Sequence, residues 1–385
     1  MATVVEETLK SPNILGNLAD LVSRCYQCAI CSGVCPKARV KPGFLPRRIV
    51  FRSLTNPAAL DDGAVWDCLT CGLCLQKCPM KVDIPGLVRT ARAGLVEMGG
   101  GCTVAHDGLK SLYGIMAGKG VKPQRRGLLA QDVKTNENSD TLYFMGCVPY
   151  LDILFKEDVN FEGMGIADNT IRLLNAVGIE PAVVDGEKCC GHDQLWRGQV
   201  DQFMELGKQN LELLKRYKRI VTSCPECYRT LALDYKEMFG AKLEVVHISE
   251  LLAKEVGKLK TNGTHRVATF HDSCRLGRHM GVYDAPREVL RALGYELREM
   301  TNTREESLCC GVPQFVRCDD ENKEIRRRRL KDAVGTGAEL LITPCAKCQI
   351  HLKCLQNDKG EELLENKYNI RIVDFTTALM ENLGR

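Results

Sequence analysis

The sequence predicts an α/β protein in which a mostly α-helical N-terminal domain precedes two repeated α/β units. Three observations predict this architecture. Two matching cysteine runs lie within the first eighty residues, a pattern of apolar runs and cysteines occurs twice after residue 140, and amphipathic segments separate the apolar runs. Because strands that alternate with helices form parallel sheets, we expect a Rossmann-like fold in each repeat.

The expected boundaries follow from these patterns. We place the helical domain at 1–98, a linker at 99–140, the first repeat at 141–258 and the second repeat at 264–385. The clearest amphipathic segments predict helices at 46–54, 61–67, 84–96, 169–177, 200–217, 285–293 and 322–334.

The sequence lacks the marks of a membrane or secreted protein. No apolar run approaches the roughly eighteen residues that cross a bilayer. The first ten residues include Glu6 and Glu7 and lack the order of a signal peptide. We therefore expect a cytoplasmic protein without a transmembrane segment.

The cysteine content is unusual, with 21 cysteines in 385 residues. The odd number, the chain length and the missing signal peptide argue against a disulfide framework. Residues 1–140 carry 18 Lys and Arg against 12 Asp and Glu, which could suit nucleic acid. Anionic metal-bound thiolates would offset that surplus, so we expect metal binding and no nucleic-acid binding.

The first two cysteine runs share one pattern, C-x2-C-x2-C-x3-C-P, which is typical of bacterial ferredoxins. Zinc sites use paired C-x2-C hooks and fit this pattern poorly. In two-cluster ferredoxins the fourth cysteine of each run binds the other cluster. The expected ligands are Cys25, Cys28, Cys31 and Cys78 for one [4Fe-4S] cubane, and Cys68, Cys71, Cys74 and Cys35 for the other.

The second part of the chain contains a five-cysteine unit twice: a lone cysteine, an adjacent pair followed by glycine, and a C-x2-C motif. The lone cysteine and the C-x2-C motif each follow an apolar run, so the thiols should converge at the carboxyl ends of parallel strands. Five thiols exceed what a cubane needs, and adjacent side chains diverge. From the residues alone we expect an unusual iron–sulfur site in each repeat. The five thiols are Cys147, Cys189, Cys190, Cys224 and Cys227 in the first repeat, and Cys274, Cys309, Cys310, Cys345 and Cys348 in the second.

The pattern C…CCG…C-x2-C, present twice behind a ferredoxin-like module, resembles the fused form of the heterodisulfide reductase catalytic subunit. The segments HDSCRLGRHMGVYDAPREVL (271–290) and SLCCG (307–311) are particularly similar to that family. The resemblance implies that each five-cysteine set holds a noncubane [4Fe-4S] cluster and that a disulfide is cleaved between the two. It also implies catalytic roles for the two pairs, Cys189, Cys190, Cys309 and Cys310. The segments after the pairs, 191–196 and 311–315, depart from the family pattern and bear on the identity of the substrate.

Several other residues are candidates for lesser roles. His192 and His271 lie beside ligand cysteines, where they could relay protons or hydrogen-bond a sulfur. Trp196 could pack in the core or line a substrate pocket. The pair Arg125-Arg126 and the run Arg326 to Arg329 are expected on solvated surfaces, although the run could also dock a partner. Cys102, Cys318 and Cys354 fit no ligand pattern.

Two functions fit these features. In the first, electrons enter through the cubanes and reduce a small-molecule disulfide to thiols. In the second, the chain is an electron conduit in a larger assembly, resembling subunits of class II benzoyl-CoA reductase or respiratory complexes. No phosphate-binding loop is present, so we expect no flavin or nucleotide in this chain. Electrons must then come from a partner, either a flavin-containing electron-donating or electron-bifurcating (HdrA-like) protein or another redox protein.

Overall fold

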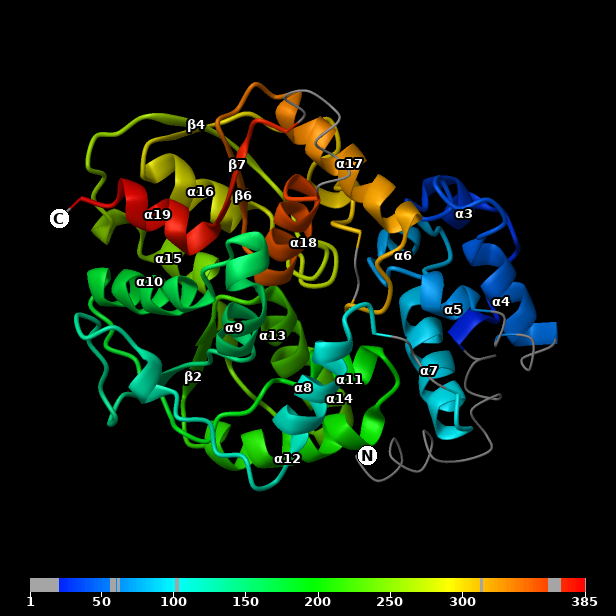
Figure 1. Cartoon of the computed structure of the whole chain (residues 1–385), viewed down its shortest axis with the longest axis horizontal. Helices are drawn as coiled ribbons and strands as arrows, with labels where there is room; N and C mark the ends of the chain where they lie inside the picture. The colour runs from blue at the N-terminus through cyan, green and yellow to red at the C-terminus, as the bar shows by residue number, and fades with distance from the viewer. Residues whose placement is uncertain are drawn as a thin grey trace.

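A computed structural model describes residues 21–55, 60, 63–100, 104–311, 314–358 and 368–384. Helices dominate the N-terminal part, and two parallel sheets follow (Figure 1). The α/β class, the helical first domain and the repeated unit are confirmed. The domain boundaries remain a prediction.

Among the described residues, five helices belong to the N-terminal part, and they lie together at the right of Figure 1. These are α3 (Ile30–Val34), α4 (Pro46–Thr55), α5 (Ala64–Asp67), α6 (Leu73–Lys77) and α7 (Ile84–Glu97). Helix α7 begins at an Asp83 cap, whose side chain accepts from Gly86 N, and it has proline in its first turn. Apolar side chains on one side of α4 and α7, among them Ile49 and Leu87, bury the core of this part.

The two cysteine runs adopt the same local structure. Gln27 and Ala29 in the first run, and Thr70 and Gly72 in the second, have positive φ angles of 60°, 67°, 47° and 78°. These left-handed turns lead into α3 and α6, and each helix ends at the fourth cysteine of its run, Cys35 or Cys78. The repeated sequence pattern therefore produces a repeated loop.

The first sheet has the parallel order β1-β2-β3, from β1 (Thr141–Tyr143), β2 (Arg219–Thr222) and β3 (Val245–His247). The second has the parallel order β5-β4-β6-β7, from β4 (Arg266–Phe270), β5 (Tyr295–Leu297), β6 (Leu340–Thr343) and β7 (Arg371–Asp374). In the first repeat, a parallel bridge between Leu142 and Ala182 lies beside β1, at the position that β5 occupies beside β4 in the second repeat. The two repeats thus share one topology.

Helices from both repeats pack together between the sheets. They are α10 (Gly163–Ala176), α15 (Ile248–Lys254), α16 (Asp284–Ala292) and α19 (Phe375–Asn382). Their buried side chains, including Ile171, Leu252, Leu290 and Leu379, form one apolar cluster. Because this cluster is shared, the two repeats are held in a fixed relation to each other.

Most of the expected helices are present. Those at 46–54, 84–96, 169–177, 200–217, 285–293 and 322–334 correspond to α4, α7, α10, α12 (Val200–Leu214), α16 and α17 (Asp320–Val334). The helix expected at 61–67 is represented by α5, and residues 61 and 62 lie outside the described residues. Within 99–140 lies α8 (Asp107–Ala117), whose Leu109, Tyr113 and Met116 are buried against the first repeat.

Two expectations about arginines were wrong. Arg125 is 1% exposed, with its guanidinium donating to Gly146 O and Glu187 O, whereas Arg126 is exposed as expected. Arg326 and Arg329 are also buried, because α17 turns this side of the helix toward the second repeat. We expected these arginines at the surface because they are charged. The sequence does not reveal that they are buried, because their partners are backbone carbonyls and side chains distant in sequence.

Candidate iron–sulfur sites and the site between the repeats

The five thiols of the first repeat converge. The sulfurs of Cys190 and Cys227 lie 3.5 Å apart. Cys147 hydrogen-bonds with Cys189, and Cys227 also hydrogen-bonds with Cys224. Four of the five are buried, and Cys147 is half-buried. The loops after β1 and β2 thus meet the adjacent pair at one point.

The second repeat reproduces this arrangement with the same partners. Cys274 hydrogen-bonds with Cys309, Cys310 with Cys348, and Cys348 with Cys345. The interaction with Cys309, aided by the charges of Arg275 and Arg278, lowers the pKa of Cys274 to about 7 despite burial. A thiol that ionises readily is suited to binding iron.

Glycine is required after each adjacent pair. Gly191 and Gly311 have φ angles of 85° and 90°, in the left-handed region. A Cβ atom at Gly191 would lie 2.7 Å from the Phe203 ring, and one at Gly311 would lie 2.7 Å from Asn322 O. The glycine of the CCG motif therefore lets the backbone turn sharply beside the sulfurs.

Three of the cysteines are N-cap residues. Cys147, Cys224 and Cys345 precede α9 (Val148–Val159), α13 (Pro225–Arg229) and α18 (Ala346–Gln356). A helix N-terminus carries partial positive charge and favours a thiolate beside it. These three helices, which sequence reasoning missed, begin where the apolar run ends.

The N-terminal cysteines associate across the two runs. Burial raises the pKa of Cys35, and the charges of Cys71 and Cys68 raise it further. A hydrogen bond with Cys28, together with the charges of Cys78 and Cys25, raises the pKa of Tyr26. The fourth cysteine of each run therefore lies with the first cysteines of the other run, as the crossed pattern requires.

The four sets of thiols lie one after another. We call the set that contains Cys25 and Cys78 the first N-terminal group and the set that contains Cys68 and Cys35 the second N-terminal group; the five-thiol sets of the two repeats are the other two groups. Cys31 in the first N-terminal group is close enough to Cys74 in the second for its charge to raise the pKa of that thiol, after the larger effect of burial. Cys71 packs in one apolar cluster with Cys309, Cys310, Cys345 and Cys348 of the second repeat. The charges of Glu226 and Cys224 from the first repeat in turn contribute to the raised pKa of Cys345. This order runs from the N-terminal domain through the second repeat to the first.

Arg278 joins the second N-terminal group to the second repeat. Its Nε donates to Cys71 O at 2.7 Å, and its Nη1 donates to Ser307 O at 2.7 Å. Burial opposes its charge, but the thiolates of Cys71, Cys274 and Cys309 raise the pKa of Arg278 above its usual value. The guanidinium thus lies between two sulfur groups as a fixed positive charge.

If both neighbouring thiol sets hold clusters, replacing Arg278 with glutamine is expected to make the reduction potentials of those clusters more negative. Loss of one nearby positive charge costs about 1 kcal/mol, equivalent to roughly 40 mV for a one-electron couple. A redox titration followed by electron paramagnetic resonance (EPR) measures the shift. Arg328→Gln, on the exposed side of α17, is the control. Equal potentials in both variants would contradict this role for Arg278.

The two C-x2-C motifs are tied by a buried ion pair. Lys347 lies within the second motif, and its Nζ forms ion pairs with Asp193 Oδ1 at 2.5 Å and with Glu226 of the first motif. Lys347, Asp193 and Glu226 are 5%, 3% and 8% exposed. Burial opposes its charge, yet the two carboxylates raise the pKa of Lys347 well above its usual value.

This network continues on both sides of the ion pairs. Tyr113 OH donates to Asp193 Oδ2 at 2.5 Å, and His192 Nδ1 lies 3.1 Å from Asp193 Oδ1. His192, Asp193 and Glu226 are close enough together to resemble a metal site. The ammonium of Lys347 already forms ion pairs with both carboxylates, so the group serves to join the two repeats.

Hydrogen bonds fix the tautomers of both candidate histidines. Arg275 Nε donates to His192 Nε2 at 3.0 Å, so the proton of His192 lies on Nδ1 and points to Asp193. Arg329 Nε donates to His271 Nδ1 at 2.9 Å, so the proton of His271 lies on Nε2. Burial lowers the pKa of both imidazoles. The two rings are therefore neutral at neutral pH.

His271 lies beside a cysteine of the second repeat. The pKa of Cys310 is well below its usual value because of Cys309 and Cys348, with smaller contributions from His271 and His351. His351 Nδ1 lies 3.5 Å from Cys310 Sγ. His192, in contrast, directs its two nitrogens to Asp193 and Arg275. Sequence reasoning missed His351, which follows Cys348 on α18.

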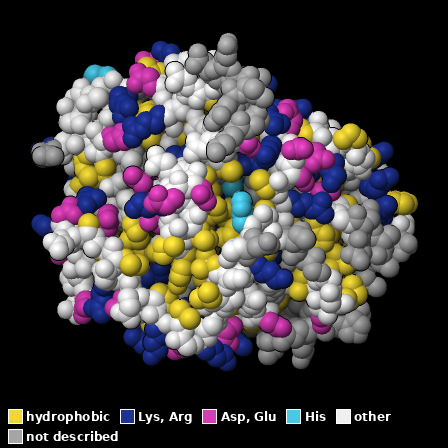
Figure 2. Space-filling model, viewed as in Figure 1, with side chains coloured by type: hydrophobic (Ala, Val, Ile, Leu, Met, Phe, Trp, Pro, Cys, Tyr) yellow, Lys and Arg dark blue, Asp and Glu magenta, His cyan; other side chains and the backbone are white. Residues whose placement is uncertain are grey.

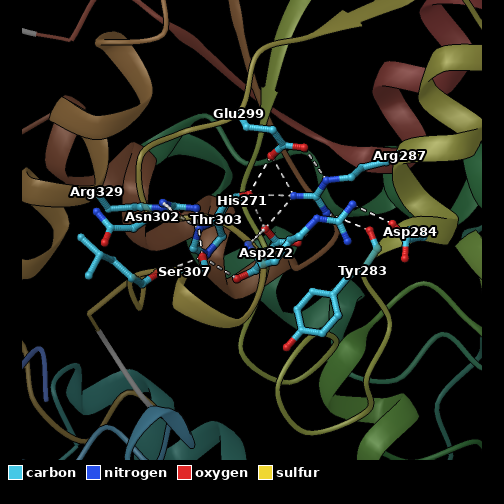
Figure 3. A network of polar contacts seen from close by, with 12 residues as sticks. His271, Asp272, Tyr283, Asp284, Arg287, Glu299, Asn302, Thr303, Ser307 and Arg329 are labelled. Carbon is cyan, nitrogen blue, oxygen red and sulfur yellow. Dashed lines mark hydrogen bonds and ion pairs between the residues drawn. The ribbon is translucent and has the colours of Figure 1, made fainter. Parts of the chain in front are cut away.

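A polar network holds His271 in place (Figure 3). Arg329 Nη2 donates to Ser307 Oγ at 3.0 Å, and Arg287 makes two bonds of 2.7 and 2.8 Å to Asp272. Asp272 also accepts from Arg304 N at 2.8 Å. These contacts connect the end of β4, α16, α17 and the loop that carries Cys309 and Cys310.

Trp196 is buried among arginines. It is 2% exposed, stacks on His192 with ring centroids 6.0 Å apart, and has the Arg275 guanidinium 4.2 Å from its centroid. It also lines a small pocket with Arg229 and Arg278. Trp196 therefore packs in the core, and its role in a substrate pocket remains a prediction. Of the remaining cysteines, Cys318 and Cys354 are half-buried, and Cys102 lies outside the described residues.

Comparisons with known proteins agree with this organisation. A cysteine-rich (CCG) domain model matches 141–232 and 268–353, and a 4Fe-4S dicluster domain model matches 21–82. Over the described residues, no helix has both the length and the apolar character needed to cross a membrane. A crystal structure of a hypothetical protein from Helicobacter pylori shares the fold, with a TM-score of 0.54 and 10% identity over 97% of this chain and 73% of that one.

Three curated relatives carry redox functions. A dihydromethanophenazine:CoB–CoM heterodisulfide reductase subunit of Methanosarcina mazei is 30% identical, over 94% of this chain and 93% of its own. A fumarate reductase (CoM/CoB) subunit of Methanothermobacter marburgensis is 29% identical, over 86% and 67%. EtfAB:quinone oxidoreductase of Syntrophomonas wolfei is 32% identical, over 74% and 42%. The chain therefore belongs to the same family as the Methanosarcina heterodisulfide reductase protein and is an iron–sulfur electron-transfer oxidoreductase.

Proposed function

We propose that the chain binds two [4Fe-4S] cubanes and two noncubane [4Fe-4S] clusters and reduces a disulfide between its two repeats. The observation that carries this proposal is the convergence of two complete five-thiol sets, joined by the Glu226–Lys347 ion pair. The donor set fits, because thiolates are the preferred ligands of such clusters. The proposed ligands are those expected from the sequence for each site.

The reaction needs two electrons and two protons for each disulfide, and it yields two thiols. When bound, the clusters would supply the electrons and an iron that takes up a thiolate. The chain's own residues orient the site, and the two protons come from solvent. His271 is neutral, so it keeps the Nε2 proton that lies beside Cys310 and hydrogen-bonds a sulfur with it, and Arg329 keeps this tautomer in place. The buried Lys347 network holds the two five-thiol sets in a fixed relation to each other.

A conduit role is the second candidate function. The relatives named as a fumarate reductase and as EtfAB:quinone oxidoreductase favour it, because their names give fumarate and a quinone, and not a disulfide, as the electron acceptor. In that case the same four clusters would pass electrons between partner proteins, and no disulfide would bind. For either function we propose a redox partner, such as a flavin-containing HdrA-like protein.

An anaerobic turnover assay separates these functions. The full chain with reconstituted clusters is supplied with reduced viologen and the CoM–CoB heterodisulfide or glutathione disulfide. We expect two viologens to be oxidised and two thiols to form for each disulfide consumed. Cluster reduction without thiol release from either disulfide would contradict the reductase and favour the conduit.

A further inference from the structure

One of the four sulfur groups contains an exposed cysteine. Of the eighteen cysteines in the ligand patterns, Cys28 is the exposed one, and the other seventeen are half-buried or buried. Rates of electron transfer between proteins fall steeply as the distance between redox centres grows. A partner that exchanges electrons with this chain therefore approaches best at Cys28, which also begins the series of four groups.

Apolar side chains surround Cys28. Tyr26, Ile30 and Met80 are 60%, 40% and 39% exposed. Tyr26 is near the sulfurs of Cys28 and Cys78, Ile30 begins α3, and Met80 follows Cys78 by two residues. Tyrosine and methionine are enriched in the cores of protein interfaces, where apolar surface leaves water. We call Tyr26, Cys28, Ile30 and Met80 the Cys28 face.

Basic side chains border this face. Five exposed residues, none of which forms an ion pair with any residue that the structure describes, are Arg24, Arg39, Arg47, Arg48 and Lys81. Two of them are held against α3, because Arg39 donates to Gly33 O and Arg47 N donates to Ser32 Oγ. In the upper right of Figure 2, Lys and Arg side chains lie beside hydrophobic ones, and Asp and Glu side chains are present among them.

The N-terminal helices that the structure describes carry few acidic groups, although the half-exposed Glu306 of the second repeat pairs with Lys77 on α6. Among the described residues between 21 and 96, the carboxylates are Asp67 and Asp83, and neither is exposed. Asp67 pairs with Lys41 and Arg317, and Asp83 caps α7. The face therefore combines an apolar centre with a rim of basic side chains that form no ion pair with any described residue, and this rim complements a partner of the opposite charge.

We propose that the Cys28 face is the docking site of a redox protein whose own cofactor lies near a surface bordered by Asp and Glu. This inference rests on the proposed function, because it requires a cluster at the Cys28 group. The apolar centre favours a protein over nucleic acid, since Ile30 and Met80 offer nothing to a phosphate backbone. The rim steers the acidic partner, and the apolar centre brings the two redox centres together.

Stopped-flow reduction of the cluster-loaded full chain tests this site. The probes are a reduced acidic ferredoxin and photoreduced deazariboflavin, a small uncharged donor. In the Arg47→Glu/Arg48→Glu variant, we expect reduction by ferredoxin to slow about tenfold at low salt and to lose most of its salt dependence. Reduction by deazariboflavin is expected to stay at the wild-type rate.

The matched control is Lys215→Glu/Arg216→Glu, which reverses two exposed charges after α12, in the first repeat. A ferredoxin rate unchanged by the Arg47/Arg48 variant, or slowed equally by the control, would overturn the docking site. If the same variant instead abolished self-association of the chain and left the ferredoxin rate unchanged, the face would belong to a second copy. Failure of deazariboflavin to reduce wild-type clusters would count against the proposed function, separately from the docking site.

Discussion

Substituting Cys310 with serine is expected to remove the cluster of the second repeat and to abolish disulfide reduction. Cys310 hydrogen-bonds with Cys309 and Cys348, and it is the cysteine that His271 and His351 approach. Serine is a poor iron ligand, so the iron content should fall by about four from the roughly sixteen of four clusters. The rate of thiol release should fall on the order of 100-fold or more. Mutating residues that hydrogen-bond a metal ligand lowers activity by about 10- to 100-fold, and removing the ligand itself should lower it at least as much.

The matched control for this substitution is Cys354→Ser. Cys354 is half-buried, and it follows Cys348 along α18, outside both thiol sets. We expect this variant to keep its iron and its activity. Iron analysis and the viologen-linked assay measure both quantities. A Cys310→Ser protein with full iron and wild-type turnover would show that Cys310 is not needed to hold a cluster in the second repeat.

Replacing Lys347 with methionine is expected to destabilise the protein by about 3–5 kcal/mol, because Asp193 and Glu226 would remain buried without a counter-charge. The loss should appear as a lower apparent melting temperature in anaerobic calorimetry. Lys353→Met is the matched control, since Lys353 lies on the same helix and donates only to the Asn160 carbonyl.

A double variant separates charge from packing. In Lys347→Met/Glu226→Gln, one of the two uncompensated carboxylates is gone, so part of the lost stability should return. If Lys347→Met and Lys353→Met melted at the same temperature, the ion pairs would not join the repeats. If Lys347→Met instead kept its stability but no longer reduced the disulfide, Lys347 would act in the reaction and not in joining the repeats.

The sequence predicted the features that depend on local spacing. The two cysteine runs, the repeated five-cysteine unit and the amphipathic helices follow from periodicity within short segments, and the structure has them. The crossed association of Cys35 and Cys78 followed from knowledge of paired ferredoxin runs. Strand ends bring cysteines from distant positions together, which explains why the convergence of each set was also foreseeable.

Contacts between the repeats were not predicted from the sequence. Glu226 and Lys347 hold matched positions in the two C-x2-C motifs and have opposite charges, so this signal was present but was not used. Arg278 and Arg275 gave no such signal, because each donates to a backbone carbonyl of the N-terminal domain, which can belong to any residue type. The burial of Arg329 likewise depends on His271 and Ser307, which are distant in sequence.

The central claim is that substrate sulfur reaches a cluster iron between the two repeats. Its most direct test is anaerobic EPR of the oxidised, cluster-loaded chain with and without added thiol, using CoM and CoB thiols as the probes. The proposed function predicts a new signal that requires thiol, persists in Cys354→Ser and disappears in Cys310→Ser or Cys190→Ser. Four intact clusters whose spectra do not change with thiol would contradict disulfide chemistry and leave the chain as an electron conduit.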